Sequence, residues 1–301
     1  MKKILLTIAI TLTLLNCKEE KKANSKLNVV TTTSMITDLV KNIGGKHINL
    51  QGLMGSGVDP HLYKASEGDV SKLSNADVIF YSGLHLEGKL VEIFEKMKNK
   101  KTIAISDVID KKTLIGSEYF ASSYDPHIWF NVDYWIQATQ FVVSKLSEAI
   151  PEQKTAFETN GANYIKQLQA LKTNLKTKIE TLPQEKRILV TAHDAFNYFG
   201  KSFNFEVVGL QGLSTATEAG VQDVQKLAAF IIEKNVKAIF IESSVPKRTI
   251  EALQAAVNSK GHNVTIGGSL YSDALGNAGT VEGTYIGMFK YNVNTIVNAL
   301  K

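Results

Sequence analysis

The stretch EQKTAFETNGANYIKQLQALKTNLKTKIET, residues 152–181, decides the fold because it divides the chain into two halves. It contains no proline. Its apolar and aromatic side chains recur every three or four positions, which is typical of one helical face: Tyr164, Leu168, Leu171, Leu175 and Ile179. One helix of about 28 residues would be roughly 42 Å long, enough to run along both halves. We expect this linking helix to occupy residues 152–182, ahead of Pro183; the alternative is a helical hairpin broken near Gly161.

On either side of this stretch, short β-branched runs alternate with helical patterns, which is typical of βαβ units and mostly parallel sheets. Four strands are expected before it, in LNVVTTTS (27–34), INLQGLM (48–54), DVIFYSG (77–83) and TIAISD (102–107). Four more are expected after it, in RILVTAH (187–193), FEVVGL (205–210), VKAIFIES (236–243) and HNVTIGG (262–268). The sequence therefore predicts an α/β fold of two lobes, residues 27–151 and 183–301. Each would hold a mostly parallel four-stranded sheet flanked by helices, and one long helix would join them.

The N-terminus is typical of an export signal. Lys2 and Lys3 precede an apolar run, residues 4–15, that is shorter than the roughly 20 residues of a membrane-spanning helix. The following Asn16-Cys17 resembles the end of a bacterial lipobox, although Asn16 replaces the usual small residue. We expect residues 1–16 to be a signal peptide and Cys17 to carry a lipid; the alternative is a plain signal peptide with an incidental cysteine.

Residues 17–26 are polar and lack apolar periodicity, so we expect a flexible tether between the lipid and the folded body. An ordinary frayed terminus would look the same. Cys17 is the only cysteine, so the fold has no intramolecular disulfide and depends on its core.

The composition is that of a globular protein, with 44% hydrophobic and 21% charged residues. The formal net charge is +5, and residues 1–16 hold two lysines and no acidic residue. The remaining 32 basic and 29 acidic residues give +3, which is too weak a charge to indicate nucleic-acid binding.

Three histidines and one aspartate follow predicted strands, two from each half: His61, His127, His193 and Asp273. Loops at the carboxyl ends of parallel strands are where α/β sheets bind ligands, since backbone groups are free there. Three imidazoles and one carboxylate are a complete ligand set for a divalent transition metal. We therefore predict a metal site between the halves.

Two of these histidines share a local sequence, Asp-Pro-His, at residues 59–61 and 125–127. The rigid proline lowers the entropy lost on placing the imidazole. The aspartate is expected to accept the second ring N–H of the histidine or to cap the following helix. A lone histidine is more often structural than metal-binding, but the repeated triplet favours ligation.

The other histidines are expected to lie outside the site. His85 follows a strand, but Gly83 and Gly88 indicate a turn there. His47 and His262 precede strands, at the opposite end of the sheet, and are expected at the surface.

Motifs of common enzyme classes are missing from the sequence: HExxH, GxSxG, the P-loop and the dinucleotide-binding glycine fingerprint. Glu242 ends a strand and is expected to orient a histidine; the alternative is a general base in a periplasmic zinc hydrolase. Because four protein ligands leave no position for a catalytic water, we expect no enzymatic activity.

The chain from about Leu27 to Lys301 resembles the solute-binding lipoproteins of bacterial metal ABC importers, the TroA, ZnuA and PsaA group (cluster A-I), and is most similar to the TroA branch. The resemblance rests on five segments: HDAFNYFG (193–200), GLQGLSTATEAG (209–220), FIESSVP (240–246), GGSLYSDALG (267–276) and GTYIGMFKYNVNTIVNAL (283–300).

This resemblance implies two α/β lobes, a single linking helix and one divalent cation between the lobes. The family's ligand positions fall on His61, His127, His193 and Asp273. Manganese-specific relatives commonly have glutamate where this chain has His193, and zinc-specific relatives often add a His-rich loop that this chain lacks. We expect zinc first, then manganese and then iron, because the ligand set and the Irving–Williams order both favour zinc.

The resemblance also implies a monomer that delivers the metal to a membrane permease with its ATPase. The protein would be exported, anchored through a lipid on Cys17, and face the periplasm or cell exterior. The alternative from another class is a surface adhesin.

Metal binding is expected to weaken as pH falls through roughly 6 to 5, because the imidazoles must be neutral. The long helix predicts modest lobe movement.

Overall fold

The computed structural model describes residues 26–97, 101–117, 120 and 122–301. The predicted signal peptide, Cys17 and the tether up to residue 25 lie outside these residues. No helix in the described part of the chain is long and apolar enough to cross a membrane.

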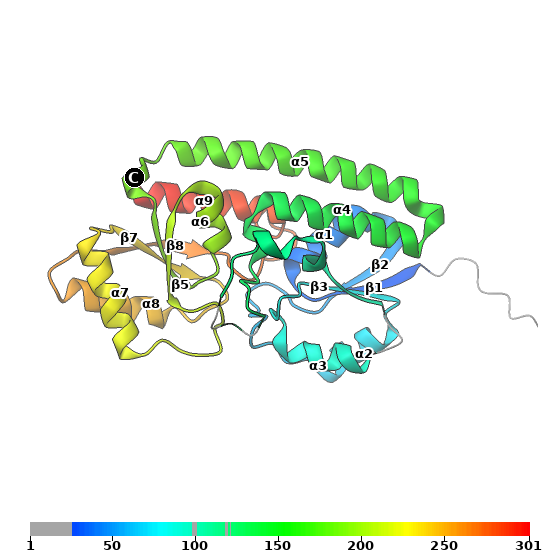
Figure 1. Ribbon diagram of the computed structural model, residues 1–301, viewed down its shortest axis with the longest axis horizontal. Coiled ribbons are helices and arrows are strands. Elements are labelled where there is room, and N and C mark those ends of the chain that lie inside the picture. Colours follow the sequence, from blue (N-terminus) through cyan, green and yellow to red (C-terminus); the bar gives the residue numbers. More distant parts are fainter. Residues whose placement is uncertain (1–25, 98–100, 118–119, 121) are drawn as a thin grey trace, which may run out of the picture.

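The first half is a parallel sheet with helices packed around it (Figure 1). Its four strands lie in the order β2-β1-β3-β4, with Val29 of β1 beside Leu50 of β2 and Val78 of β3. The elements in chain order are β1 (Leu27–Thr31), α1 (Ser34–Gly44), β2 (Ile48–Gly52), α2 (Glu67–Asn75), β3 (Val78–Tyr81), α3 (Gly88–Lys96), β4 (Lys101–Ala104) and α4 (Val132–Ala149).

The second half repeats the alternation of strands and helices. Its elements are β5 (Ile188–His193), α6 (Asn197–Phe203), β6 (Glu206–Gln211), α7 (Val221–Glu233), β7 (Ala238–Glu242), α8 (Arg248–Asn258), β8 (Thr265–Leu270) and α9 (Tyr285–Leu300). All eight predicted strands are therefore present. The four of this half form two parallel hydrogen-bonded pairs, β5-β6 and β7-β8, with β5 next to β7, where the sequence predicted one sheet. A register shift between Ile239 and Phe240 interrupts the β7-β8 ladder.

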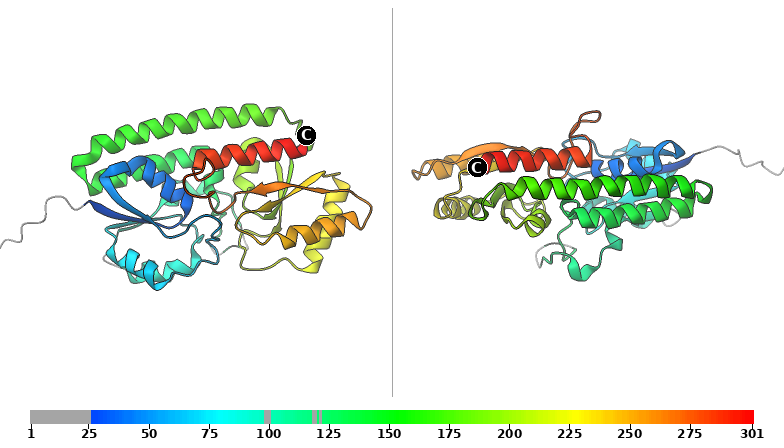
Figure 2. Two further views of the ribbon diagram at one scale, coloured as in Figure 1. Left: turned by 180° about the vertical axis from the view of Figure 1, so that it is seen from behind. Right: turned by 90° about the horizontal axis from the view of Figure 1, so that it is seen from above.

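The linking helix is continuous, so the alternative of a hairpin broken near Gly161 is wrong. α5 (Lys154–Glu180) packs against α1 and α4 of the first half and α9 of the second, and Figures 1 and 2 show it running along both. Its predicted apolar stripe is buried. A Cβ on Gly161 would lie 2.4 Å from Cγ2 of Val143 in α4. Glycine is needed there for close helix packing and does not break the helix.

One of three buried apolar clusters is shared by the two halves. The largest cluster of buried hydrophobic side chains contains residues of both halves and of α5. Phe130, which precedes α4, packs against Phe196 of the second half with ring centroids 4.4 Å apart, and against Phe289 of α9 at 5.8 Å. The two halves and the linking helix therefore pack together through this shared cluster.

Candidate metal centre

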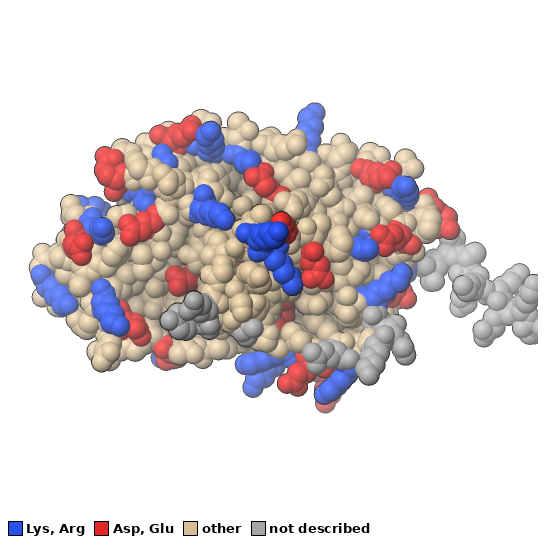
Figure 3. All heavy atoms as spheres, in the orientation of Figure 1, with Lys and Arg blue, Asp and Glu red and all other residues tan. Residues whose placement is uncertain are grey.

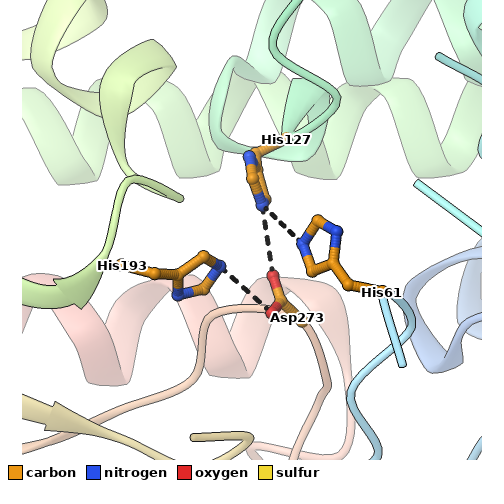
Figure 4. Close-up of side chains that lie close together, drawn as sticks. All are labelled: His61, His127, His193 and Asp273. Atoms are coloured by element: carbon orange, nitrogen blue, oxygen red, sulfur yellow. Dashed lines mark hydrogen bonds and ion pairs between the residues drawn. The ribbon is translucent and has the colours of Figure 1, made fainter. Parts of the chain in front are cut away.

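Four segments of the chain, two from each half, bring His61, His127, His193 and Asp273 together (Figure 4). His61 lies in the loop after β2, and His127 precedes the short 3₁₀ helix Ile128–Phe130. His193 is the last residue of β5, and Asp273 follows β8. One nitrogen or oxygen atom of each residue lies within 4.8 Å of the others, and all four side chains are buried. Among the described residues this is the single group of three or more potential ligands of this kind.

The two Asp-Pro-His triplets fold alike at the backbone but differ at the ring. Oδ1 of Asp59 accepts the backbone N–H of His61 (2.8 Å), and Oδ1 of Asp125 accepts that of His127 (2.9 Å). These are the local turns that aspartate forms with the residue two positions on. Only Asp125 also contacts the ring, at 2.7 Å from Nδ1 of His127. Asp59 instead accepts the hydroxyl of Thr215, from the other half, at 2.5 Å.

Glu242, at the end of β7, holds His193 in place. Its Oε1 accepts the backbone N–H of His193 (2.9 Å), and its Oε2 lies 2.6 Å from the ring Nδ1. Glu242 is 4% exposed. The ring Nδ1 atoms of His127 and His193 therefore both face carboxylates, so their Nε2 atoms are directed to the centre of the cluster (Figure 4).

The centre contains polar atoms without hydrogen bonds. Nε2 of His193 and Oδ1 of Asp273 are buried and have no hydrogen-bond partner. Nε2 of His193 does lie 3.2 Å from Oδ2 of Asp273, but without the geometry of a hydrogen bond. Nε2 of His61 and Nε2 of His127 are 3.4 Å apart. Buried polar atoms are rarely unpaired, and converging lone pairs are what a bound cation would satisfy.

Burial and neighbouring charges shift the pKa values of His61, His193 and Asp273 in different directions. Burial lowers the pKa of His61 to about 3, so its imidazole is neutral. Burial also opposes charge on His193, but the carboxylates of Glu242 and Asp273 outweigh it and raise its pKa well above the ordinary value. For Asp273, the three imidazoles overcome the burial penalty and hold its pKa below the usual range. The site is therefore built around one carboxylate that stays ionised.

The remaining histidines lie outside the cluster. His85 is exposed in a turn, with φ of 63°, and its ring centroid is 6.2 Å from that of Phe120. His47 packs edge-on against Phe157, and Nε2 of His262 lies 2.9 Å from the carbonyl of Val236.

Several supporting residues were not predicted from the sequence. Trp129 donates its Nε1–H to the carbonyl of Ser272, next to Asp273, at 2.9 Å. Thr215 and Asn197 bind the two aspartates of the triplets, Asp59 and Asp125. Trp129 and Asn197 could have been noticed in the sequence because each lies within four residues of a candidate ligand. A single sequence does not show which distant residues they contact.

Comparison with known proteins places this arrangement in context. Residues 29–299 match the profile of the ZnuA family, described as the periplasmic component A of a zinc-uptake complex. The manganese-binding lipoprotein MntA of Bacillus subtilis is 49% identical over 93% of this chain and 92% of its own. The zinc-binding protein TroA of Treponema pallidum is 48% identical over 94% and 91%. The solved structure of that periplasmic TroA superposes with a TM-score of 0.89, covering 92% of this chain and 99% of the other.

Proposed function

The chain belongs to the ZnuA family of periplasmic zinc-uptake components, and from this premise we propose that it captures one divalent metal ion between its halves for delivery to an ABC importer. The observation that carries the proposal is the convergence of four buried ligand groups from four separate segments of the chain. Relatives that share about half of its residues are named for binding manganese or zinc, and both metals are proposed as cargo.

The spacing of the ligand atoms suits a metal ion. In a tetrahedral zinc site with bonds of about 2.0–2.1 Å, neighbouring ligand atoms are about 3.3–3.4 Å apart. Nε2 of His61 lies 3.4 Å from Nε2 of His127, Oδ1 of Asp273 lies 3.5 Å from Nε2 of His127, and Oδ2 of Asp273 lies 3.2 Å from Nε2 of His193. The whole set of ligand atoms lies within 4.8 Å of one another. The proposed ligands are therefore His61, His127 and His193 through Nε2, and Asp273.

The carboxylate of Asp273 allows the site to accept different metals, one ion at a time. Its Oδ1 faces His127 and its Oδ2 faces His193. Both oxygens are thus available, and a carboxylate that binds through both adds a fifth donor, which suits manganese or iron better than four donors would. Three imidazoles still give zinc the higher intrinsic affinity, so we place zinc first and manganese second.

Glu242 and Asp125 support the ligands without binding the metal in this proposal. Each accepts the Nδ1–H of one histidine, which fixes the tautomer that presents Nε2 and raises the basicity of the ring. Glu242 is already occupied by two bonds to His193, so it lacks the free oxygen that a general base for hydrolysis needs. The family relatives are transport proteins, and we propose that this chain is likewise no enzyme.

A protein that delivers metal to an importer acts outside the cytoplasmic membrane. We propose a signal peptide of residues 1–16, a lipid on Cys17 and a tether to residue 26. Lobes of residues 27–151 and 183–301 would follow, joined through 152–182. The proposed partners are a permease with its ATPase, and the protein would act as a monomer facing the periplasm or cell exterior. On the face in Figure 3, acidic and basic side chains are interspersed.

Metal stoichiometry tests this proposal. The purified, demetallated protein is re-equilibrated with zinc or manganese, desalted and analysed by elemental mass spectrometry, beside His193→Ala and the control His262→Ala. We expect one retained equivalent in the parent and the control, and loss of retention in His193→Ala because one of four ligands is gone. Equal retention in all three proteins would refute the ligand assignment.

A further inference from the structure

The carboxylate of Asp125 accepts hydrogen bonds from both halves of the protein. This carboxylate is fully buried, and its Oδ1 accepts both the backbone N–H and the ring Nδ1–H of His127. Its Oδ2 accepts a hydrogen bond from Nδ2 of Asn197, at 3.0 Å. Asn197 belongs to the second half, where it begins α6. The group that orients a histidine of one half is therefore held by a side chain of the other.

The same amide also reaches the loop of His193. Nδ2 of Asn197 lies 3.2 Å from the carbonyl oxygen of Asp194, the residue after His193. An amide nitrogen carries two hydrogens, so it can donate to both acceptors at once. The bonds form a chain from the ring of His127 through Asp125 and Asn197 to the backbone next to His193. Two proposed ligands from different halves are thus connected behind the metal position.

From this connection we infer that Asn197 is a positioning residue for metal capture, an inference that rests on the proposed function. It fixes the plane of the Asp125 carboxylate, which in turn fixes the ring of His127 relative to His193. Asn197 is the donor that the described residues supply to Oδ2 of Asp125. Without it, a buried carboxylate oxygen has no partner, and only the bonds between Oδ1 and His127 remain to orient the group.

The neighbouring Tyr198 offers a matched control. Its hydroxyl donates to the backbone carbonyl of Asp125 (3.0 Å) and accepts the N–H of Ile115 (3.2 Å). These bonds cross the same interface but do not touch the carboxylate. If Asn197 merely held the halves together, losing either residue's bonds would have the same effect on the site.

The test compares Asn197→Ala, Asn197→Leu and Tyr198→Phe with the parent protein. Leucine has nearly the shape of asparagine without the donor, so it separates loss of the bond from loss of packing. Zinc affinity is measured by competition with a chelator. The Nδ1–H signal of His127 is followed by NMR in the metal-free protein, and thermal unfolding reports on the fold.

We expect both Asn197 variants to lose up to about tenfold in zinc affinity and to shift the Nδ1–H signal, since a direct partner of a metal-binding histidine typically contributes about 10- to 100-fold and Asn197 acts one bond further out. Tyr198→Phe is expected to lower thermal stability and leave affinity and signal unchanged. Wild-type affinity in a folded Asn197 variant, or an equal loss in Tyr198→Phe, would overturn the inference. A parent protein that binds no zinc would instead refute the proposed function.

Discussion

Replacing Glu242 by glutamine should weaken metal binding although no proposed ligand is changed. Glutamine has the size of glutamate but only one acceptor oxygen. The two oxygens of Glu242 accept the backbone N–H and the ring Nδ1–H of His193, so in either orientation one donor of His193 faces the amide NH₂. Changes of this kind cost about 10- to 100-fold in metal affinity, or about 1.4–2.8 kcal/mol.

The charge of Glu242 has an opposing effect, which determines the pH of the assay. Because its carboxylate helps to raise the pKa of His193, removing it makes the metal-free imidazole easier to deprotonate. That partial gain is largest where protons compete with the metal and becomes smaller as the pH of the assay rises. Zinc affinity is therefore measured at pH 8 by competition with a chelator.

Glu87→Gln is the matched control. Glu87 is also buried, at 2% exposure. Its Oε1 accepts the hydroxyl of Thr32 (2.6 Å) and the backbone N–H of Ser82 (2.8 Å), and its Oε2 accepts the backbone N–H of Gly83 (3.4 Å); none of these residues is a proposed ligand. Both variants should lower the free energy of unfolding by about 1–3 kcal/mol, but only Glu242→Gln should lose zinc affinity. Unchanged affinity in Glu242→Gln, or an equal loss in Glu87→Gln, would refute the reasoning.

Three further predictions concern pH, packing and metal release. Because the pKa of His193 is raised, its imidazole must lose a proton when the metal binds. Zinc affinity should therefore fall about tenfold for each pH unit below that pKa, and the fall should begin at a higher pH than an ordinary histidine would give. Zinc affinity measured by calorimetry that stays constant from pH 8 to 5 would contradict this. Gly161→Val should lower the free energy of unfolding, measured in urea, by about 1–3 kcal/mol without changing the metal stoichiometry. Adding Val143→Ala should restore part of the lost stability. An unchanged free energy of unfolding in Gly161→Val would show that α4 and α5 do not pack as described. Trp129→Phe removes the donor to the carbonyl of Ser272 and should speed zinc release to a chelator in stopped flow, whereas an unchanged rate would show that this bond does not hold the Asp273 loop.

Local pattern was enough to predict the elements of this fold. The eight strands and the helix of residues 154–180 follow from periodicity, which depends only on neighbouring residues. The pairing of β5-β6 and β7-β8 as separate ladders was not predictable in this way, because it depends on contacts between strands far apart in the sequence. Gly161 was ambiguous for the same reason, since its role is set by Val143 of another helix.

The candidate site was predictable to the level of residue type and strand position. The convergence of His61, His127, His193 and Asp273 follows from the rule that ligands bind at the carboxyl ends of parallel strands. The two Asp-Pro-His triplets look equivalent in sequence. Only the structure shows that Asp125 contacts its histidine ring while Asp59 bonds across the interface to Thr215. Such differences arise from tertiary contacts, which a single sequence does not encode locally.

Anomalous diffraction at the zinc edge, from crystals of the zinc-loaded protein, tests the central claim most directly. The account predicts one strong peak, with Nε2 of His61, His127 and His193 and at least one oxygen of Asp273 about 2.0–2.2 Å from it. A peak at another position, or a fully loaded protein in which any of these four side chains points away from the ion, would contradict it.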